Sequence, residues 1–216
     1  MSELDDRTPE ADVSPDDPAD GAAPGPLRWI EELVNTHSVE FGTDDIATAD
    51  ALAGWLRARR LLPAGVPVGA GEHDRALRVR EGLRALIALN NSGPDLAAGT
   101  TGDAAGAGEP REGIVPGALA DLAGLAPDLP LMLDVRSRPP RIAPRDPGSA
   151  DAALALMLGL VAAAVAEGTW VRLKACREPG CRWIYYDHSR NRSRAWCSMA
   201  SCGNRAKARA FRRRLG

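Results

Sequence analysis

The sequence predicts a mainly α-helical chain with a small β-hairpin (α+β), in which a helical N-terminal domain precedes a small cysteine-rich unit. Three observations lead to this fold class. Aromatic residues make up only 4% of the 216 residues, which argues against a packed all-β protein. Apolar residues recur at helical spacing between residues 27 and 168. All four cysteines lie within residues 176–202, so the C-terminal unit, residues 169–216, is expected to be organised differently.

Two segments have compositions that do not support a packed core. Residues 1–26 contain eight acids, five prolines and no aromatic residue, so they bury too little apolar surface to offset the entropy of ordering. We predict a disordered acidic tail there. Residues 99–113 are rich in Gly, Ala and Thr without periodicity, which predicts a mobile loop within the helical domain of residues 27–168.

Hydrophobic spacing predicts the first three helices. Apolar residues share a face from Leu27 to Val34, from about Thr48 to Leu62, and from Glu72 to Asn90. The third pattern is the most regular, and turn-forming residues end it. Its apolar side consists of Leu77, Leu83, Leu86, Ile87 and Leu89, and its polar side of Arg75, Arg78, Arg80 and Arg84.

A hairpin and a fourth helix complete the predicted helical domain. Residues 131–135 and 141–143 flank a turn-like segment and are expected to pair as β-strands. Ser149 is suited to cap a helix with Asp151 in its first turn, and Gly168 is suited to its C-terminal end. The intervening sequence is apolar all round, which predicts the central helix of the domain.

The cysteines form two pairs, Cys176-x4-Cys181 and Cys197-x4-Cys202, which 15 residues separate. Two pairs joined by a loop of this length are typical of a tetrathiolate zinc site, to which each pair contributes two ligands. Two disulfides or four unrelated core thiols are the alternatives. Four thiolates leave no coordination position for water, so we expect one structural Zn²⁺.

The residues around the cysteines predict the local fold. Residues 183–186 have strand composition, residues 187–191 are turn-like, and residues 194–196 can return as a second strand. Ser198 can cap a helix over residues 199–214, which places the last cysteine where the positive end of the helix dipole favours a thiolate. A knuckle, a hairpin and a helix that carries the last ligand describe a treble-clef-like zinc finger.

Motifs in both parts of the chain resemble known families. Cys202-Gly203-Asn204-Arg205, together with the preceding residues 187–197, resembles the CGNR zinc finger. Residues 33–36 and 52–56 are similar to the ABATE domain that usually precedes this finger. The resemblance covers roughly residues 28–214, and it implies a stress-induced transcription regulator that holds zinc on the four cysteines. The 99–113 loop and the acidic tail depart from the family pattern.

Charge is distributed unevenly along the chain. Residues 171–216 hold 13 Lys or Arg and two acids, a net charge of +11, so the rest of a chain with overall charge −2 carries −13. Segregated positive charge favours a polyanion partner, because each paired arginine releases counterions from a phosphate backbone; a solvated surface is the alternative. The residues expected to contact nucleic acid are Arg190, Arg192 and Arg194 along one side of the hairpin and Arg205, Lys207, Arg209, Arg212 and Arg213 on the final helix.

We therefore predict a zinc-dependent nucleic-acid-binding protein, specifically a DNA-binding transcriptional regulator with an N-terminal sensor or dimerisation domain. An RNA-binding or protein-docking zinc module is the alternative. Asn35 and Thr36, at the end of the first helix, form either part of a pocket for a small-molecule effector or a polar helix cap. The chain has no dinucleotide fingerprint and no nucleophile with an evident base, so we do not expect an enzyme.

The sequence also indicates where the protein acts. The longest uncharged apolar run, residues 152–166, is 15 residues long, short of the ~20 that a bilayer span needs. Residues 1–20 are acidic and lack the apolar stretch of a secretory signal. We expect a cytoplasmic protein with no membrane partner. The sequence leaves open whether the chain forms a homodimer.

Overall fold

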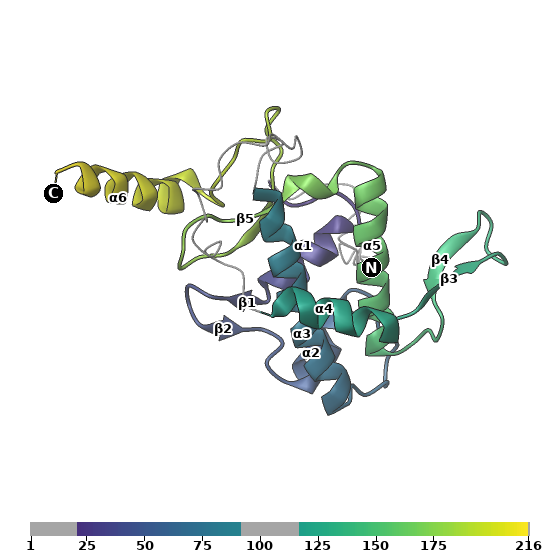
Figure 1. Ribbon diagram of the computed structural model, residues 1–216. Helices are drawn as coiled ribbons and strands as arrows, with labels where there is room; N and C mark the ends of the chain where they lie inside the picture. The colour runs from purple at the N-terminus through teal and green to yellow at the C-terminus, as the bar shows by residue number, and fades with distance from the viewer. Residues whose placement is uncertain (1–20, 92–116, 216) are drawn as a thin grey trace, which may run out of the picture.

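The computed structural model describes residues 21–91 and 117–215. It confirms a mainly α-helical fold with small antiparallel sheets (Figure 1). The N-terminal helices are α1 (Leu27–Asn35), α2 (Ala49–Ala58), α3 (Ala70–Ala88), α4 (Ala118–Leu125) and α5 (Ala150–Ala166). Short helical turns follow at η1 (Leu89–Asn91), η3 (Ala126–Asp128) and η4 (Trp170–Arg172). A π-helical turn, η5 (Met199–Gly203), leads into the last helix, α6 (Asn204–Leu215).

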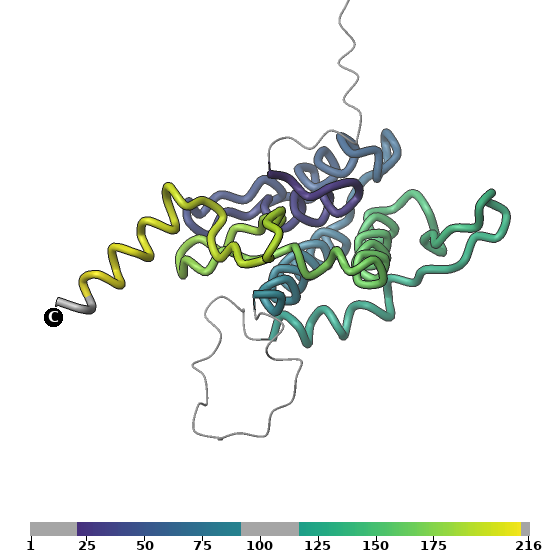
Figure 2. Tube along the Cα trace, turned by 90° about the horizontal axis from the view of Figure 1, so that it is seen from above, coloured from purple at the N-terminus to yellow at the C-terminus, as the bar shows by residue number. Residues whose placement is uncertain are grey.

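Three two-stranded antiparallel sheets join these helices. They pair β1 (His37–Ser38) with β2 (Thr43–Asp44), β3 (Leu131–Asp134) with β4 (Arg141–Pro144), and β5 (Leu173–Ala175) with β6 (Ile184–Tyr186). The predicted hairpin over residues 131–143 is therefore confirmed, and its register sets Leu133 opposite Ile142. Figures 1 and 2 both show this hairpin and α6 projecting from opposite sides of the helical body.

The end of the predicted acidic tail belongs to the fold. Ala23 is only 2% exposed, and its N–H donates to Glu31 Oε2 at 2.6 Å. The expectation of disorder is wrong for residues 21–26, because one small buried side chain and one hydrogen bond fix this segment against α1, and composition does not reveal such a contact. Residues 1–20 and the predicted loop 99–113 lie outside the described residues.

The first two helices begin where the sequence predicts. The apolar face of α1 is buried, with Ile30 and Leu33 fully covered. At α2 the side chain of Thr48 accepts the N–H of Ala51 at 3.1 Å, as an N-cap residue does. The helix ends before the predicted Leu62, and Arg60 just beyond it has a left-handed backbone with φ of 57°.

The central helix is α3, which packs against α1, α2, α4, α5 and β5. The prediction that α5 is central is wrong, because the last turns of α5 reach solvent and Val165 is 57% exposed. The predicted ends of α5 are confirmed. Ser149 accepts the N–H of Ala152 at 3.1 Å, and Gly168 after the helix has φ of 70°, a conformation that glycine adopts without strain.

Two arginines on the predicted polar side of α3 are buried instead. Arg80 and Arg84 are 4% and 1% exposed. Arg80 forms a two-point ion pair with Asp44 at 2.7 and 2.9 Å, and Arg84 donates to the Val34 carbonyl at 2.6 Å. Glu81 accepts from both guanidinium groups, at 3.1 and 3.0 Å. Periodicity assigns any arginine to the solvent side, but a guanidinium can be buried where acids and carbonyls satisfy its donors.

The sequence did not predict α4, which packs closely on α3. The contact depends on Gly82: a Cβ at this position would lie 2.6 Å from Leu122 Cβ and 3.1 Å from the Ala118 carbonyl oxygen. A glycine in the middle of an amphipathic helix costs stability by itself, so its presence here is explained by the close approach of the two backbones.

The β5–β6 sheet of the C-terminal unit shares the core of the helical domain. Leu173 and Ile184 are fully buried in one cluster with α1, α3 and α5 side chains. The Asn35 side chain donates to the Ile184 carbonyl and accepts its N–H, both at 2.8 Å. Asn90 and Asn91 bond backbone groups of η4 and β5 in a similar way. The helical domain thus supports the base of the C-terminal unit.

The predicted hairpin of the C-terminal unit has a different partner strand. Residues 184–186 form β6 as expected, but they pair with residues 173–175 rather than with 194–196. Strand composition identifies a strand but does not determine its partner, and here the partner is the buried segment before the first cysteine.

None of the helices that the structure describes is both long and apolar enough to cross a bilayer.

Candidate metal centre and basic surface

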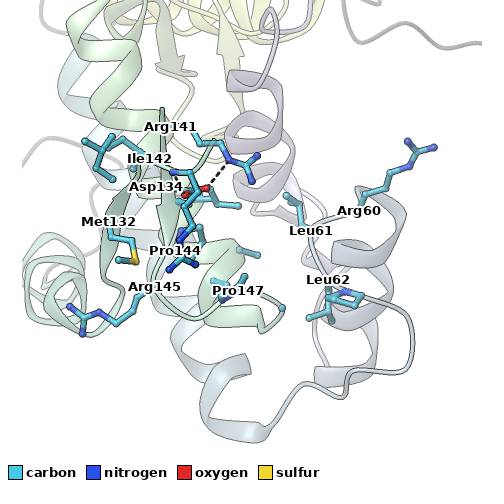
Figure 3. Close-up of a pocket in the computed structure, with 18 of the residues that line it drawn as sticks. Arg60, Leu61, Leu62, Met132, Asp134, Arg141, Ile142, Pro144, Arg145 and Pro147 are labelled. Carbon is cyan, nitrogen blue, oxygen red and sulfur yellow. Dashed lines mark hydrogen bonds and ion pairs between the residues drawn. The ribbon is translucent and has the colours of Figure 1, made fainter. Parts of the chain in front are cut away.

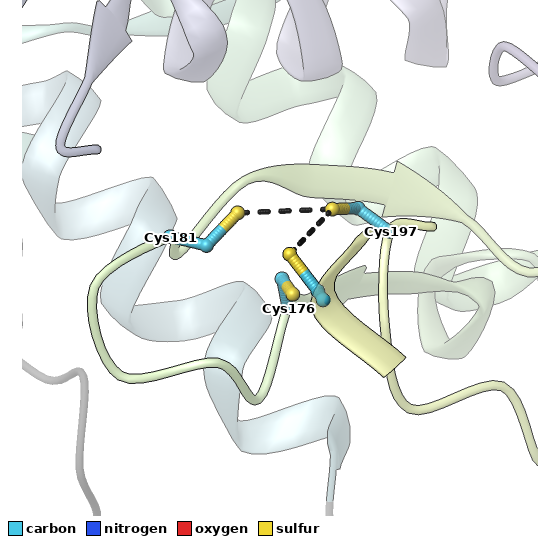
Figure 4. Close-up of side chains that lie close together, drawn as sticks. Cys176, Cys181 and Cys197 are labelled. Carbon is cyan, nitrogen blue, oxygen red and sulfur yellow. Dashed lines mark hydrogen bonds between the residues drawn. The ribbon is translucent and has the colours of Figure 1, made fainter. Parts of the chain in front are cut away.

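The four cysteine sulfurs converge on one point. Their Sγ atoms all lie within 4.8 Å of one another (Figure 4). The Sγ of Cys197 is 3.7 Å from that of Cys181 and 3.6 Å from that of Cys202. A tetrahedral Zn²⁺ with Zn–S bonds of ~2.3 Å requires S···S separations of about 3.8 Å. The donor set and its spacing therefore fit one structural zinc with a closed thiolate shell.

Backbone hydrogen bonds place Cys176 and Cys181, and a capped helical turn carries Cys202. Cys176 follows β5 and donates its N–H to the Trp183 carbonyl at 2.8 Å. Cys181 donates to the Glu178 carbonyl at 2.9 Å, which closes a tight turn before β6. Cys202 lies in η5, and the side chain of Ser198 caps that turn by accepting the N–H of Ser201, as the sequence predicted for Ser198.

Gly203 allows η5 to close tightly. A Cβ at this position would lie 2.8 Å from the Sδ of Met199 and 3.0 Å from its Cε. Asn204 is exposed, and its side-chain amide donates to the Ala200 carbonyl of its own helical turn at 3.0 Å rather than to the hairpin backbone. Cys202, Gly203 and Asn204 thus have local roles in the turn that carries the last ligand.

The electrostatics of the site favour a bound cation. Hydrogen bonds with Cys181 and Cys197 lower the pKa of the Cys176 thiol, whereas hydrogen bonds with Cys176 and Cys197 raise the pKa of the Cys181 thiol. Four crowded sulfurs therefore do not ionise together unless a cation balances them. Arg205 adds positive charge at the edge of the site, because its Nη2 donates to Cys202 Sγ at 2.9 Å.

Acids engage two of the predicted phosphate-binding arginines. Arg205 forms a two-point ion pair with Glu40 of the β1–β2 turn, at 2.5 and 3.1 Å, and this contact raises the pKa of Arg205. Arg209 pairs with Glu178, with one of the two bonds at 2.8 Å. Glu178 is 7% exposed. The sequence analysis predicted neither acid as a partner. The one available signal was that Glu178 lies between the first two cysteines.

The loop between β6 and Cys197 is organised around a buried carboxylate. Asp187 is fully buried and accepts hydrogen bonds from Lys174 Nζ at 2.7 Å, from the Ser189 hydroxyl at 2.6 Å and from the Arg194 N–H at 3.1 Å. Burial opposes ionisation of this carboxyl, but the bonds from Lys174 and Ser189 hold its pKa below the usual value. Asp187 lies in the predicted turn of residues 187–191, but the sequence did not predict its buried ion pair with Lys174.

The three arginines of this loop do not share one extended side. Arg192 has a left-handed backbone with φ of 50°, so the period-two alternation expected for residues 190–194 is wrong. Arg194 lies over the Tyr185 ring, with its guanidinium carbon 4.6 Å from the ring centroid, and donates to the Trp196 carbonyl at 2.9 Å. Arg190 and Arg192 are exposed.

The exposed part of the predicted basic surface is smaller than the sequence indicated. Tyr185 and Tyr186 are buried core residues, so they add no surface for nucleic acid. On α6, Lys207 is exposed, and the description of side chains ends before Arg213. Arg190, Arg192, Lys207 and Arg212 combine a predicted role with an exposed side chain and, unlike exposed Arg205, have no acid partner among the described residues.

Asn35 and Thr36 have structural partners instead of a pocket. Asn35 binds the backbone of Ile184, and the Thr36 hydroxyl donates to the Leu33 carbonyl at 2.7 Å and accepts from Arg80 at 3.3 Å. Neither residue lines the two cavities described for this chain. The polar-cap alternative therefore accounts for Thr36, and the pocket hypothesis for this pair is not supported.

Comparison with known families agrees with both halves of this description. Residues 172–215 match the CGNR zinc finger, the segment that contains all four cysteines. Residues 27–169 match the ABATE family, which is described as "Putative stress-induced transcription regulator". A search of curated proteins found no match. The chain therefore belongs to the ABATE family and carries a CGNR zinc finger with one structural zinc site after its ABATE domain.

Proposed function

We propose that this protein is a DNA-binding transcription regulator whose zinc-organised finger docks on the phosphate backbone. The proposal rests on four exposed basic residues on two segments next to the metal centre, one of which ends at Cys197 and the other of which begins after Cys202. These residues, the exposed basic set, are Arg190, Arg192, Lys207 and Arg212. One segment is the loop that leads to Cys197. The other is α6, which projects away from the helical body where a nucleic acid can reach it (Figure 2).

The role of zinc in this proposal is to hold the two segments in place. A domain of this size buries little apolar surface, and a structural metal compensates for the missing core. A closed four-thiolate shell offers no open position for substrate, which supports a role in binding rather than catalysis. Side chains of β5 and β6 in the finger pack in the core of the ABATE domain, so a conformational change in that domain would act directly on the finger.

The test compares affinities for three nucleic acids at one salt concentration. We expect the zinc-loaded full-length chain to bind duplex DNA more tightly than single-stranded DNA or RNA of equal length, measured by fluorescence anisotropy. Tighter binding of RNA would support the RNA-binding alternative, and no binding to any of the three would support a protein-docking module. Either result contradicts the proposal.

A charge-matched pair of variants locates the contact surface. The finger variant replaces Arg190, Arg192, Lys207 and Arg212 by Ala. The control variant replaces Arg60, Arg136, Arg138 and Arg145 by Ala, which are exposed arginines of the helical domain. We expect the first variant to retain zinc and to lose at least about tenfold in DNA affinity, with a smaller loss in the control. Equal losses would place the contact elsewhere.

A further inference from the structure

A large cavity lies in the helical domain, between the end of α2, the β3–β4 hairpin and the first turns of α5 (Figure 3). Its volume is about 1080 Å³. Pockets for small molecules in proteins occupy ~300–1,000 Å³, so this cavity has room for a ligand of substantial size. It shares no residue with the metal centre or with the exposed basic set of the finger.

The floor of this cavity is apolar. Leu62 is 3% exposed and Ala153 is fully buried, and both line the cavity with Leu156. Its wall includes Leu133 and Ile142, which face each other across the hairpin and are 56% and 55% exposed. Exposure of large aliphatic side chains to water is unfavourable, and an aliphatic ligand in the cavity would cover them.

The rim of the cavity is strongly basic. Its lining includes five arginines, namely Arg57, Arg60, Arg136, Arg141 and Arg145. The one acid among the lining residues is Asp134, which already accepts the Ser137 hydroxyl at 2.5 Å and the Arg136 N–H at 3.0 Å. Figure 3 shows Arg141 directed inward from the hairpin, close to Asp134, whereas Arg60 and Arg145 extend outward at the mouth.

One of these arginines has a buried donor without a partner. Arg57 Nη2 donates to the Val66 carbonyl at 2.6 Å, but Arg57 Nε is buried and has no hydrogen-bond partner among the described residues. A buried unsatisfied donor on a cation costs free energy, and no acid among the described residues pairs with this guanidinium, so Arg57 adds uncompensated positive charge beside the cavity.

We propose that this cavity binds an amphipathic anion, with a carboxylate or phosphate head among the arginines and an aliphatic chain along the apolar floor. A neutral apolar ligand would leave the excess positive charge uncompensated. A small hydrophilic anion would leave the floor and the hairpin wall exposed to water. The combination of five arginines and an aliphatic floor therefore selects a ligand that carries both properties.

Calorimetric titration of the zinc-loaded full chain tests the proposal. The probes are dodecanoate, dodecyl phosphate and dodecan-1-ol, all below their micelle concentrations, with acetate and inorganic phosphate as head groups alone. We expect both anionic amphiphiles to bind one per chain, and the tighter of the two identifies the natural head group. Dodecanol should bind at least about tenfold more weakly, since it lacks the charge-assisted bonds. Decanoate should also bind roughly tenfold more weakly than dodecanoate, because it buries two fewer CH₂ groups.

Two arginines of the same hairpin provide matched variants. Arg141 lines the cavity, whereas Arg138 at the hairpin tip does not and bonds the Val135 carbonyl. The Arg141 side chain is 72% exposed, so Arg141→Ala should fold normally. We expect Arg141→Ala to weaken dodecanoate binding about tenfold and Arg138→Ala to leave it unchanged.

Four outcomes would overturn the proposal. They are no binding of either anionic amphiphile, equal binding of dodecanol, equal effects of Arg141→Ala and Arg138→Ala, and binding of a peptide of residues 1–20 without binding of either amphiphile. The last outcome would assign the cavity to the acidic N-terminal segment of the chain itself. DNA affinity is measured separately, so failure here does not affect the proposed function.

Discussion

Glu40 and Arg205 illustrate how single residues set the binding surface of the finger. Arg205 belongs to the CGNR motif, yet its guanidinium contacts Glu40 of the ABATE domain and the sulfur of Cys202. A phosphate would have to compete with Glu40 for this arginine. The sequence assigns a charge to each residue but does not reveal which charges are already paired within the chain.

Replacing Glu40 therefore should strengthen nucleic-acid binding. We predict that Glu40→Gln releases Arg205 and raises DNA affinity a few-fold at low salt, with the gain shrinking as salt screens the charges. Asp45→Asn is the matched control, because it removes the same charge from an exposed position directly after β2. Anisotropy titrations at two salt concentrations measure both. Equal gains in the two variants would show a general charge effect instead.

Asp187 should control the stability of the finger. Its side chain and that of Lys174 are 0% and 8% exposed, so Asp187→Asn leaves a buried ammonium without its counter-charge. We predict a loss of about 3 kcal/mol in the free energy of unfolding of the zinc-loaded chain at pH 7. The double variant with Lys174→Met should lose less than Asp187→Asn alone, which urea denaturation can measure.

The same carboxylate gives a defined pH dependence. The pKa of Asp187 is lower in the folded chain than its ordinary value near ~3.9, so its contribution is complete above that value and disappears as the pH falls through the folded pKa. The difference in stability between wild type and Asp187→Asn should therefore shrink below about pH 4. A difference that stays constant down to pH 2 would exclude this role.

At the scale of elements, helices with a clear apolar face were predictable and their polar partners were not. The buried residues of α1 and the caps Thr48, Ser149 and Ser198 follow from spacing and local chemistry. The burial of Arg80 depends on Asp44, 36 residues away, and no local pattern encodes that pairing. The pairing of β5 with β6 likewise depends on tertiary contacts with α3.

The packing of α4 on α3 predicts opposite effects at two glycines of one helix. Gly82→Ala places a Cβ against Leu122 and the Ala118 carbonyl, and should lower the free energy of unfolding by about 1–3 kcal/mol. Gly71→Ala has room, since the nearest atom is the flexible end of Arg75 at 3.5 Å, and should raise stability by up to about 1 kcal/mol. Thermal or urea denaturation measures both. Equal effects would mean that the helices do not approach as closely as described.

At the scale of the whole molecule, the finger and the ABATE domain form one continuous core. The Asn35–Ile184 bonds and the buried side chains of β5 and β6 join them. The sequence predicted two successive units with a boundary after residue 168, since composition and cysteine content change there. The contacts across that boundary come from residues far apart in the chain and were not visible from the sequence.

Removing zinc should therefore loosen more than the finger. We predict one Zn²⁺ per chain by native mass spectrometry, and its loss in Cys197→Ser. Hydrogen exchange should then increase across residues 172–203 and also at the end of α1, where Asn35 holds β6. Protection that is unchanged at α1 would show that the two parts are energetically separate.

If the exposed basic residues around the zinc site bind nucleic acid through phosphates, the affinity for DNA depends on salt in a predictable way. If Arg190, Arg192, Lys207 and Arg212 each neutralise one phosphate, replacing all four by Ala should flatten the slope of log K against log salt by about 3.6, at ~0.9 per contact. Zinc content and thermal stability should match wild type. A slope equal to that of wild type would show that these four residues make no phosphate contacts.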